Sequence, residues 1–117
     1  MASKSRAKVG TKIGTKAQAP SDERMLCRTP TPGKQPTRIP KWKYDVVRKA
    51  VLKAVPKRGD GVAAKDLKDL VRPHLTAAQL DELGSLGWHV TTVKLNMEVE
   101  GELVRVANAT PQRLLRR

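Results

Sequence analysis

Two prolines and two glycines divide residues 41–117 into short segments. Pro56 and Pro73 cannot lie inside an α-helix, because proline has no backbone N–H and its ring clashes with the preceding turn. Gly84 and Gly101 suit the left-handed conformation in which many helices end. This part of the chain can therefore form several short helices but no long one.

Apolar residues recur at helical spacing in the first two segments. The first expected helix starts near residue 41 and ends before Pro56, and the second ends near Arg72 because Pro73 follows. Their apolar positions are Tyr44, Val47, Val51 and Ala54, then Ala63, Leu67, Leu70 and Val71. We expect two amphipathic helices joined by the KRGDG loop.

A third, short helix is expected after Thr76. Thr76 and Gln79 have the spacing of a capping box, in which two side chains satisfy backbone donors at a helix start. A fourth helix is expected over about residues 86–100, and Gly84 separates the two. Its expected core stripe is Val90, Val93 and Met97.

The stretch MEVEGELVRV begins with helical spacing and ends like a strand. Leu103, Val104 and Val106 read as a strand, residues 107–110 as a turn, and residues 112–115 as a second strand that pairs back. Helix, helix, short helix, helix, hairpin is the order of a winged helix. The expected fold class is mainly α with a small β-hairpin: a helix-turn-helix plus a wing, preceded by a disordered basic arm.

The junction between the fourth helix and the hairpin carries a first resemblance. The pattern Met97-Glu98-x-x-Gly101-x-Leu103-x-Arg105 resembles the helix-to-wing junction of bacterial winged-helix regulators, the multiple-antibiotic-resistance-type proteins among them.

A second resemblance covers residues 26–113. Its motifs are Thr-Pro-x-Pro-Gly-Lys near Thr31, Thr37-Arg38-Ile39, Tyr44, Gly87-Trp88, Val93-Lys94-Leu95 and Glu98-x-x-Gly101. Together they resemble a family of small uncharacterised bacterial winged-helix-like proteins. The resemblance implies a fold but no activity, and it implies that the proline-rich segment belongs partly to the domain.

Positive charge is concentrated in the first part of the chain. The 24 Lys and Arg residues exceed the 11 Asp and Glu residues, which gives a net charge of +13. Residues 1–43 hold 11 basic and 2 acidic residues, net +9, and residues 44–117 hold 13 and 9, net +4. A field of this size attracts polyanions such as nucleic acid or anionic lipid.

The charge and the prolines predict three regions. Residues 1–25 lack apolar periodicity and are expected to form a disordered basic N-terminal arm. Residues 26–40 contain four prolines and are expected to be an extended spacer, with a ligand for a proline-reading domain as the alternative. Residues 41–117 are expected to be the winged-helix domain.

The single cysteine and the absence of a long apolar run bear on location. Cys27 cannot form a disulfide within the chain, which favours a reducing bacterial cytoplasm and, for a basic protein, the nucleoid. No run of about 18 apolar residues is present, so no membrane partner is expected. Residues 1–21 are basic and free of acids, which leaves an organellar transit peptide as an alternative.

Two groups of residues are expected to contact nucleic acid. The fourth helix would enter the major groove with His89, Thr91, Thr92, Lys94 and Asn96. Phosphate contacts are expected from Lys4, Arg6, Lys8, Lys12 and Lys16 in the arm, Lys65 and Lys68 on the second helix, and Arg105, Arg113, Arg116 and Arg117 around the hairpin. Against groove reading, the fourth helix has no arginine, and Glu98, Glu100 and Glu102 would repel phosphates.

A protein partner is the alternative for the same helix. Leu95 and Val99 lie off the expected core stripe and could form a partner surface together with Trp88. For Trp88 itself, packing in the core is favoured over stacking on bases. His74, His89 and Cys27 show no metal-ligand spacing, and no glycine-rich phosphate loop is present. We therefore expect no enzyme activity, catalytic residue, metal or cofactor.

The expected function is binding of nucleic acid, with DNA favoured over RNA, as a small DNA-binding regulator or a nucleoid-associated protein. The alternative is a protein-interaction winged helix whose basic arm contacts RNA or an acidic partner. The sequence leaves the oligomeric state open, a homodimer included.

The arm is expected to supply affinity rather than specificity. Deleting residues 1–25 should flatten the dependence of log K on log salt, because each neutralised phosphate releases counterions. The measurement is a titration of random duplex DNA at several salt concentrations. An unchanged slope would contradict a phosphate-binding arm.

Overall fold

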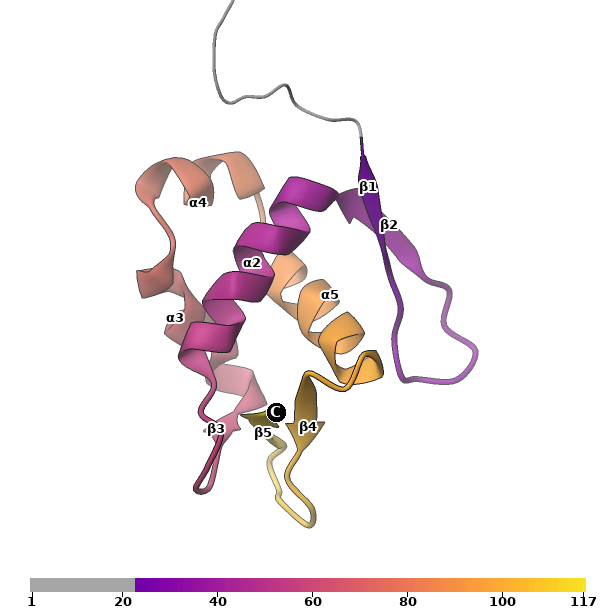
Figure 1. Ribbon diagram of the computed structural model, residues 1–117, viewed down its shortest axis with the longest axis vertical. Helices are drawn as coiled ribbons and strands as arrows, with labels where there is room; N and C mark the ends of the chain where they lie inside the picture. Colours follow the sequence, from indigo (N-terminus) through magenta and orange to yellow (C-terminus); the bar gives the residue numbers. More distant parts are fainter. Residues whose placement is uncertain (1–22) are drawn as a thin grey trace, which may run out of the picture.

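The computed structural model describes residues 23–117, and about half of these residues are helical (Figure 1). In chain order the described elements are β1 (Arg24–Cys27), β2 (Thr37–Pro40), α2 (Lys41–Ala54), β3 (Val62–Ala63), η1 (Ala64–Asp66), α3 (Leu67–Val71), η2 (Arg72–His74), α4 (Ala77–Leu83), α5 (Leu86–Val99), β4 (Leu103–Arg105) and β5 (Arg113–Arg116). The elements η1 and η2 are 3-10 turns. The expected combination of short helices with a small C-terminal hairpin is confirmed.

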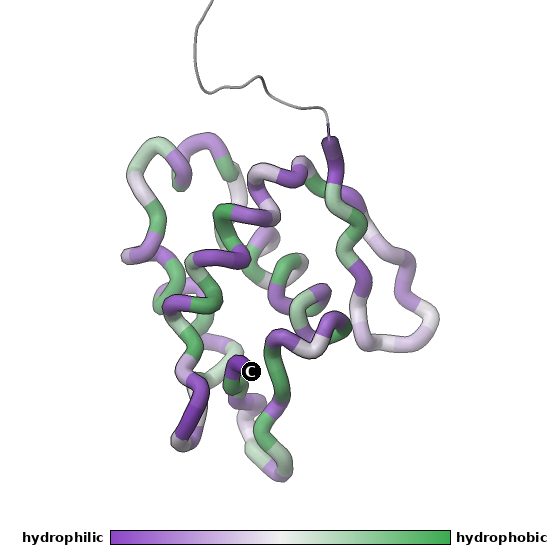
Figure 2. The backbone as a smooth tube through the Cα atoms, in the orientation of Figure 1, coloured by the Kyte–Doolittle hydropathy of each residue, from purple (hydrophilic) through white to green (hydrophobic). Residues whose placement is uncertain are grey.

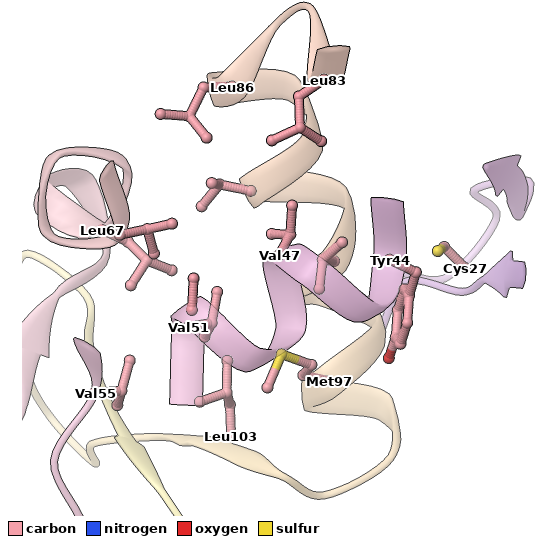
Figure 3. Packing of buried hydrophobic residues seen from close by; sticks show 14 of the residues in the cluster. Cys27, Tyr44, Val47, Val51, Val55, Leu67, Leu83, Leu86, Met97 and Leu103 are labelled. Carbon is pink, nitrogen blue, oxygen red and sulfur yellow. The ribbon is translucent and has the colours of Figure 1, made fainter. Parts of the chain in front are cut away.

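Helices α2 and α5 pack against each other at the centre of the domain (Figure 1). α2 ends at Ala54, two residues before Pro56. Tyr44, Val47 and Val51 are buried as predicted, and Figure 3 shows them in one cluster with Met97 of α5. Along α2, hydrophobic and hydrophilic residues alternate in bands (Figure 2), as expected for a helix with one buried face.

The second helix is shorter than predicted. Ala63 belongs to β3 and lies opposite Arg113 of β5, and α3 begins only at Leu67. A buried alanine fits a strand as well as a helix, so apolar spacing alone could not distinguish the two. Leu67 and Val71 are buried as predicted, whereas Leu70, also expected on the apolar face, is 38% exposed.

The predicted caps of the next two helices are confirmed. The Thr76 hydroxyl accepts a hydrogen bond from the Gln79 N–H at 3.1 Å, and the Gln79 side chain accepts one from the Thr76 N–H at 2.9 Å. Gly84 and Gly101 both have a φ of 82°. The predicted stripe of α5 is also confirmed, since Val90, Val93 and Met97 are all buried.

The C-terminal hairpin is confirmed with slightly different bounds. β4 and β5 are antiparallel, with Leu103 opposite Arg116, and β5 starts at Arg113 rather than at residue 112. Val106 lies just beyond β4. β5 is the middle strand of a three-stranded sheet with the order β3–β5–β4, and this sheet buries Leu103 and Leu114 in the core.

A second hairpin, β1–β2, forms where an arm and a spacer were predicted. Its strands are antiparallel, and Cys27 and Ile39 lie in the same core as the helices. Figure 3 shows Cys27 beside Tyr44 of α2. The folded unit therefore begins before residue 41. The second resemblance had implied this, since it placed the proline-rich segment partly within the domain. The prolines of this segment prevent a helix but permit strands joined by a long turn.

The N-terminal limit of β1 also corrects the predicted arm. Arg24 and Met25, assigned to the arm from sequence, belong to β1. The rest of the predicted arm, including Lys4, Arg6, Lys8, Lys12 and Lys16, lies outside the described residues. A deletion that removes the arm without cutting the hairpin therefore ends at residue 22.

Gly61 is held at a close approach between β3 and β5. Its φ is 76°, and a Cβ at this position would lie 2.3 Å from the backbone oxygen of Leu114. Gly59 has a similar φ of 87° but has nothing within 4 Å. We predict that Gly61→Ala lowers the free energy of unfolding by roughly 3 kcal/mol or more, whereas Gly59→Ala costs about 1 kcal/mol of backbone strain. Urea denaturation measures both, and equal losses would contradict a backbone clash at Gly61.

Candidate nucleic-acid interface

The face of α5 opposite its buried stripe is the candidate interface. Thr91 is exposed on this face, and Trp88 has 49% of its surface exposed. Ser85 caps the helix, because its hydroxyl accepts a hydrogen bond from the Trp88 N–H at 3.2 Å. Thr91 and Thr92 are thus the predicted base-contacting residues that keep an outward position.

Asn96, predicted to face a DNA groove, is instead fully buried. Its side-chain oxygen accepts a hydrogen bond from the Arg28 backbone N–H at 2.9 Å, and its side-chain nitrogen donates one to the Tyr44 hydroxyl at 2.9 Å. Asn96 therefore links α5 to both α2 and the β1–β2 hairpin. The prediction failed because the hairpin, unforeseen from sequence, covers this flank of the helix.

His89 is also unavailable to bases. It is 8% exposed, and its Nδ1 lies 2.7 Å from the Ser85 backbone oxygen one turn earlier. Its ring meets the Trp88 ring in a T-shaped contact with centroids 4.9 Å apart. The prediction that His89 reads a base edge is therefore wrong, since its ring is used within the domain.

The three glutamates that follow the middle of α5 are all paired. Glu98 pairs with Lys94, whose Nζ lies 3.2 Å away, and with Arg105. Glu100 pairs with Arg28 of the β1–β2 hairpin, and Glu102 pairs with Arg48 of α2. The glutamates therefore do not form the repulsive patch expected from sequence.

Pairing also removes several predicted phosphate contacts. Lys94 and Arg105 share Glu98, so neither is a free cation. Arg113 donates to the backbone oxygens of Asp60 and Gly61 at 2.8 Å, and Arg116 donates to that of Val55 at 2.8 Å. These arginines hold the sheet to the loop after α2. Of the basic residues predicted around the C-terminal hairpin, Arg117 is exposed at the chain end.

Lys68, one of the predicted phosphate-binding residues, lies beside the start of α5. It is exposed on α3, and a Cβ added at Gly87 would lie 3.4 Å from its Cδ. Lys65 is exposed nearby on η1. Lys68 thus brings a positive charge to the start of α5, and its predicted contact with phosphate stays a prediction.

A groove of about 410 Å³ separates α5 from the β1–β2 hairpin. Trp88, Thr92 and Leu95 line its α5 side, and residues between Cys27 and Thr37 line its hairpin side. Arg28 and Lys34 are among them, and none of the described residues that line the groove is acidic. These hairpin residues were not predicted to form a site. The one signal that the segment belongs to the domain was the resemblance that includes the Thr-Pro-x-Pro-Gly-Lys motif.

The predicted partner surface is found only in part. Trp88 does not pack in the core as predicted, since about half of its surface is exposed. Leu95 and Val99 are half-buried. The exposed apolar surface on this side of α5 is therefore dominated by Trp88.

Among the described residues, no three His, Cys, Asp or Glu side chains gather where a metal ion could bind. Burial raises the pKa of the Cys27 thiol to about 11, so this thiol stays protonated at neutral pH and is a poor nucleophile. None of the helices in the described part of the chain is long and apolar enough to cross a membrane.

Helices and two small antiparallel sheets around one core define a basic α+β domain with a groove along α5. Residues 24–114 match the model of a family described as "Family of unknown function (DUF6958)", and the chain belongs to this family. The match begins with β1 and ends within β5, so the matched region includes the N-terminal hairpin. No curated protein and no solved structure matches the chain significantly.

The buried amide of Asn96 generates a stability prediction. Asn96→Ala leaves the Arg28 N–H and the Tyr44 hydroxyl without their partner and opens a cavity, so we expect a loss of about 2–4 kcal/mol in the free energy of unfolding. Thr91→Ala, on the exposed face of the same helix, should change it by less than about 0.5 kcal/mol.

A double-mutant cycle with Tyr44→Phe isolates the bond between α5 and α2. The double variant should lose less stability than the sum of the two single losses, because the same hydrogen bond is removed in each. Chemical denaturation provides the three values. Full additivity, or an Asn96→Ala variant as stable as the parent, would contradict the link between these elements.

Proposed function

We propose that this domain is a winged helix that binds nucleic acid, with DNA as its main partner. The order of α2, β3, α3, the short α4, α5, β4 and β5 along the chain and the strand order β3–β5–β4 support a winged-helix arrangement. In this arrangement α5 is the helix presented to the nucleic acid, and the turn between β4 and β5 is the wing. The junction motif at residues 97–105 supports a distant likeness to regulators of the multiple-antibiotic-resistance type.

The observation that carries the proposal is the positive charge left after the acids near α5 are paired. Residues 23–117 hold 19 Lys and Arg against 10 Asp and Glu. Glu98, Glu100 and Glu102 are neutralised by cations, whereas none of the described ion pairs uses Lys34, Lys65 or Lys68. Of these, Lys34 lines the groove beside α5 and Lys68 lies next to Gly87 at the start of α5, where a phosphate backbone would pass.

Binding through phosphates should dominate over the reading of base edges. Thr91 and Thr92 are the expected base-contacting residues that remain outside the core. A threonine side chain cannot form the bidentate contact with a base by which Arg and Asn select one sequence. Weak sequence preference suits a nucleoid-associated protein better than a regulator with one operator. A bacterial cytoplasm with a nucleoid is the location that this proposal implies.

A protein-interaction role is the second candidate, and the exposure of Trp88 favours it. A tryptophan that is 49% exposed, with Leu95 beside it on the same groove, has the composition of an interface anchor. In that case the basic residues would contact RNA or an acidic partner, or a second copy of the chain would cover the groove.

Lys68→Gln tests the proposal. For the full chain, we predict weaker binding to random duplex DNA and a slope of log K against log salt that is flatter by about 0.9, because one phosphate contact is lost. Lys53→Gln is the matched control, since Lys53 lines a separate hollow formed by α2, η2 and α4. Fluorescence anisotropy over a range of salt concentrations measures both slopes.

Equal slopes for the two variants would contradict an interface beside α5. Selection from a random duplex library tests the second part of the proposal, because strong enrichment of one sequence would contradict phosphate-dominated binding. Absence of any nucleic-acid binding by the full chain would leave the protein-interaction role as the better candidate.

A further inference from the structure

We propose that the groove between α5 and the β1–β2 hairpin binds an unpaired nucleotide of a nucleic-acid strand, with its base stacked on Trp88 and its phosphate beside Lys34. The proposal rests on the proposed nucleic-acid binding and assigns the substrate class: nucleic acid that contains a single-stranded stretch. In Figure 1 the hairpin runs alongside α5, and the polar contact between Arg28 and Asn96 holds the two together.

The α5 side of the groove offers a stacking surface. Trp88 lines the groove and keeps about half of its surface exposed, although a tryptophan on a helix usually buries most of its ring. The T-shaped contact with His89 restrains the orientation of the indole. Base–aromatic stacking is tolerant of sequence because every base has a π-face. Leu95 extends the apolar side of the groove next to this ring.

The hairpin side of the groove offers cations and hydrogen-bonding groups. Lys34 takes part in none of the described ion pairs, and Arg28 also lines the groove, with its guanidinium paired to Glu100. The hydroxyl of Thr31 and the amide of Gln35 can hydrogen-bond to a base edge. None of the described residues that line the groove is acidic, so the groove favours a ligand that carries a negative charge and hydrogen-bonding groups, such as a nucleotide.

The size of the groove and the position of its walls favour an unpaired base over a duplex. Its volume of about 410 Å³ lies at the scale of sites for single small molecules. Within a duplex both faces of each internal base are covered by its neighbours, so an internal paired base cannot stack on Trp88. The B-DNA major groove is about 12 Å wide and accepts one helix, whereas α5 has a hairpin beside its outer face.

The two tryptophans of the chain provide a test. Trp42 is 38% exposed on α2, away from the groove lining, so Trp42→Phe leaves Trp88 as the single tryptophan reporter. Titrating this full-length variant with a thymidine oligonucleotide should quench its fluorescence saturably. A matched duplex should bind with little quenching. The Trp88→Phe variant, which retains Trp42, should show no saturable quenching with either ligand.

Affinity measurements separate stacking from charge. Trp88→Ala should weaken single-strand binding by roughly 5- to 150-fold, the range expected for one lost base–aromatic stack, and should weaken duplex binding much less. Trp42→Ala, the matched control, should change both by less than about twofold. Lys34→Gln should flatten the slope of log K against log salt for single-strand binding by the amount expected for the loss of about one phosphate contact. Circular dichroism verifies that each variant is folded.

Several results would overturn the groove assignment while leaving the proposed function intact. One is binding of the single strand without quenching of Trp88 fluorescence. Another is a Trp88→Ala variant whose affinity falls equally for single strands and duplexes. A third is quenching by polyglutamate, which carries charge but no bases, equal to that by the oligonucleotide. Thymidine monophosphate that binds as tightly as the oligonucleotide would assign the groove to free nucleotides instead. If neither single strands nor duplexes bind the parent protein, the proposed function itself fails.

Discussion

The side-chain amide of Asn96 is the interaction on which the arrangement of this domain depends. A buried amide must have its donors and acceptor satisfied, and here separate elements satisfy them: the Tyr44 hydroxyl on α2 and the Arg28 N–H on the N-terminal hairpin. Apolar contacts of Cys27 and Ile39 bring the hairpin to the core without fixing its position, since the hydrophobic effect is not directional. The hydrogen bonds add that direction. They set the hairpin at a defined height along α5, and so they define the groove between the two.

The ion pairs around the end of α5 have a different role. The pairs of Arg28 with Glu100 and of Arg48 with Glu102 are partly exposed, and pairs of this kind contribute little to stability. Glu98 and its partner Lys94 are both nearly covered, whereas its other partner, Arg105, is exposed. Their effect is on the surface potential. Arg28, Arg48, Lys94 and Arg105 pair with three glutamates, so these seven groups together carry a net charge of +1. Lys34 beside the groove and Lys68 at the start of α5 add positive charge that none of the described ion pairs uses.

These two features together explain why reading base edges with α5 has little support. In the proposed winged helix α5 would be the recognition helix, but its polar residues divide between the core and the surface: Asn96 and His89 face inward, and Thr91 and Thr92 face outward. What remains outside is an aromatic ring beside a basic hairpin. Such a surface suits contacts with phosphates and with the face of a base better than contacts with the edges of paired bases.

The sequence by itself determined the local elements, because caps, breakers and apolar spacing act within a few residues. The capping box at Thr76, the glycine ends at Gly84 and Gly101, and the buried stripe of α5 all followed from such short-range rules. The tertiary structure alone decided the rest. Whether Ala63 joins a strand depends on β5, which lies about 50 residues further along the chain. Whether Asn96 faces solvent depends on a hairpin 68 residues earlier. Burial and charge pairing of this kind depend on which distant segments meet, and no local pattern in one sequence records that.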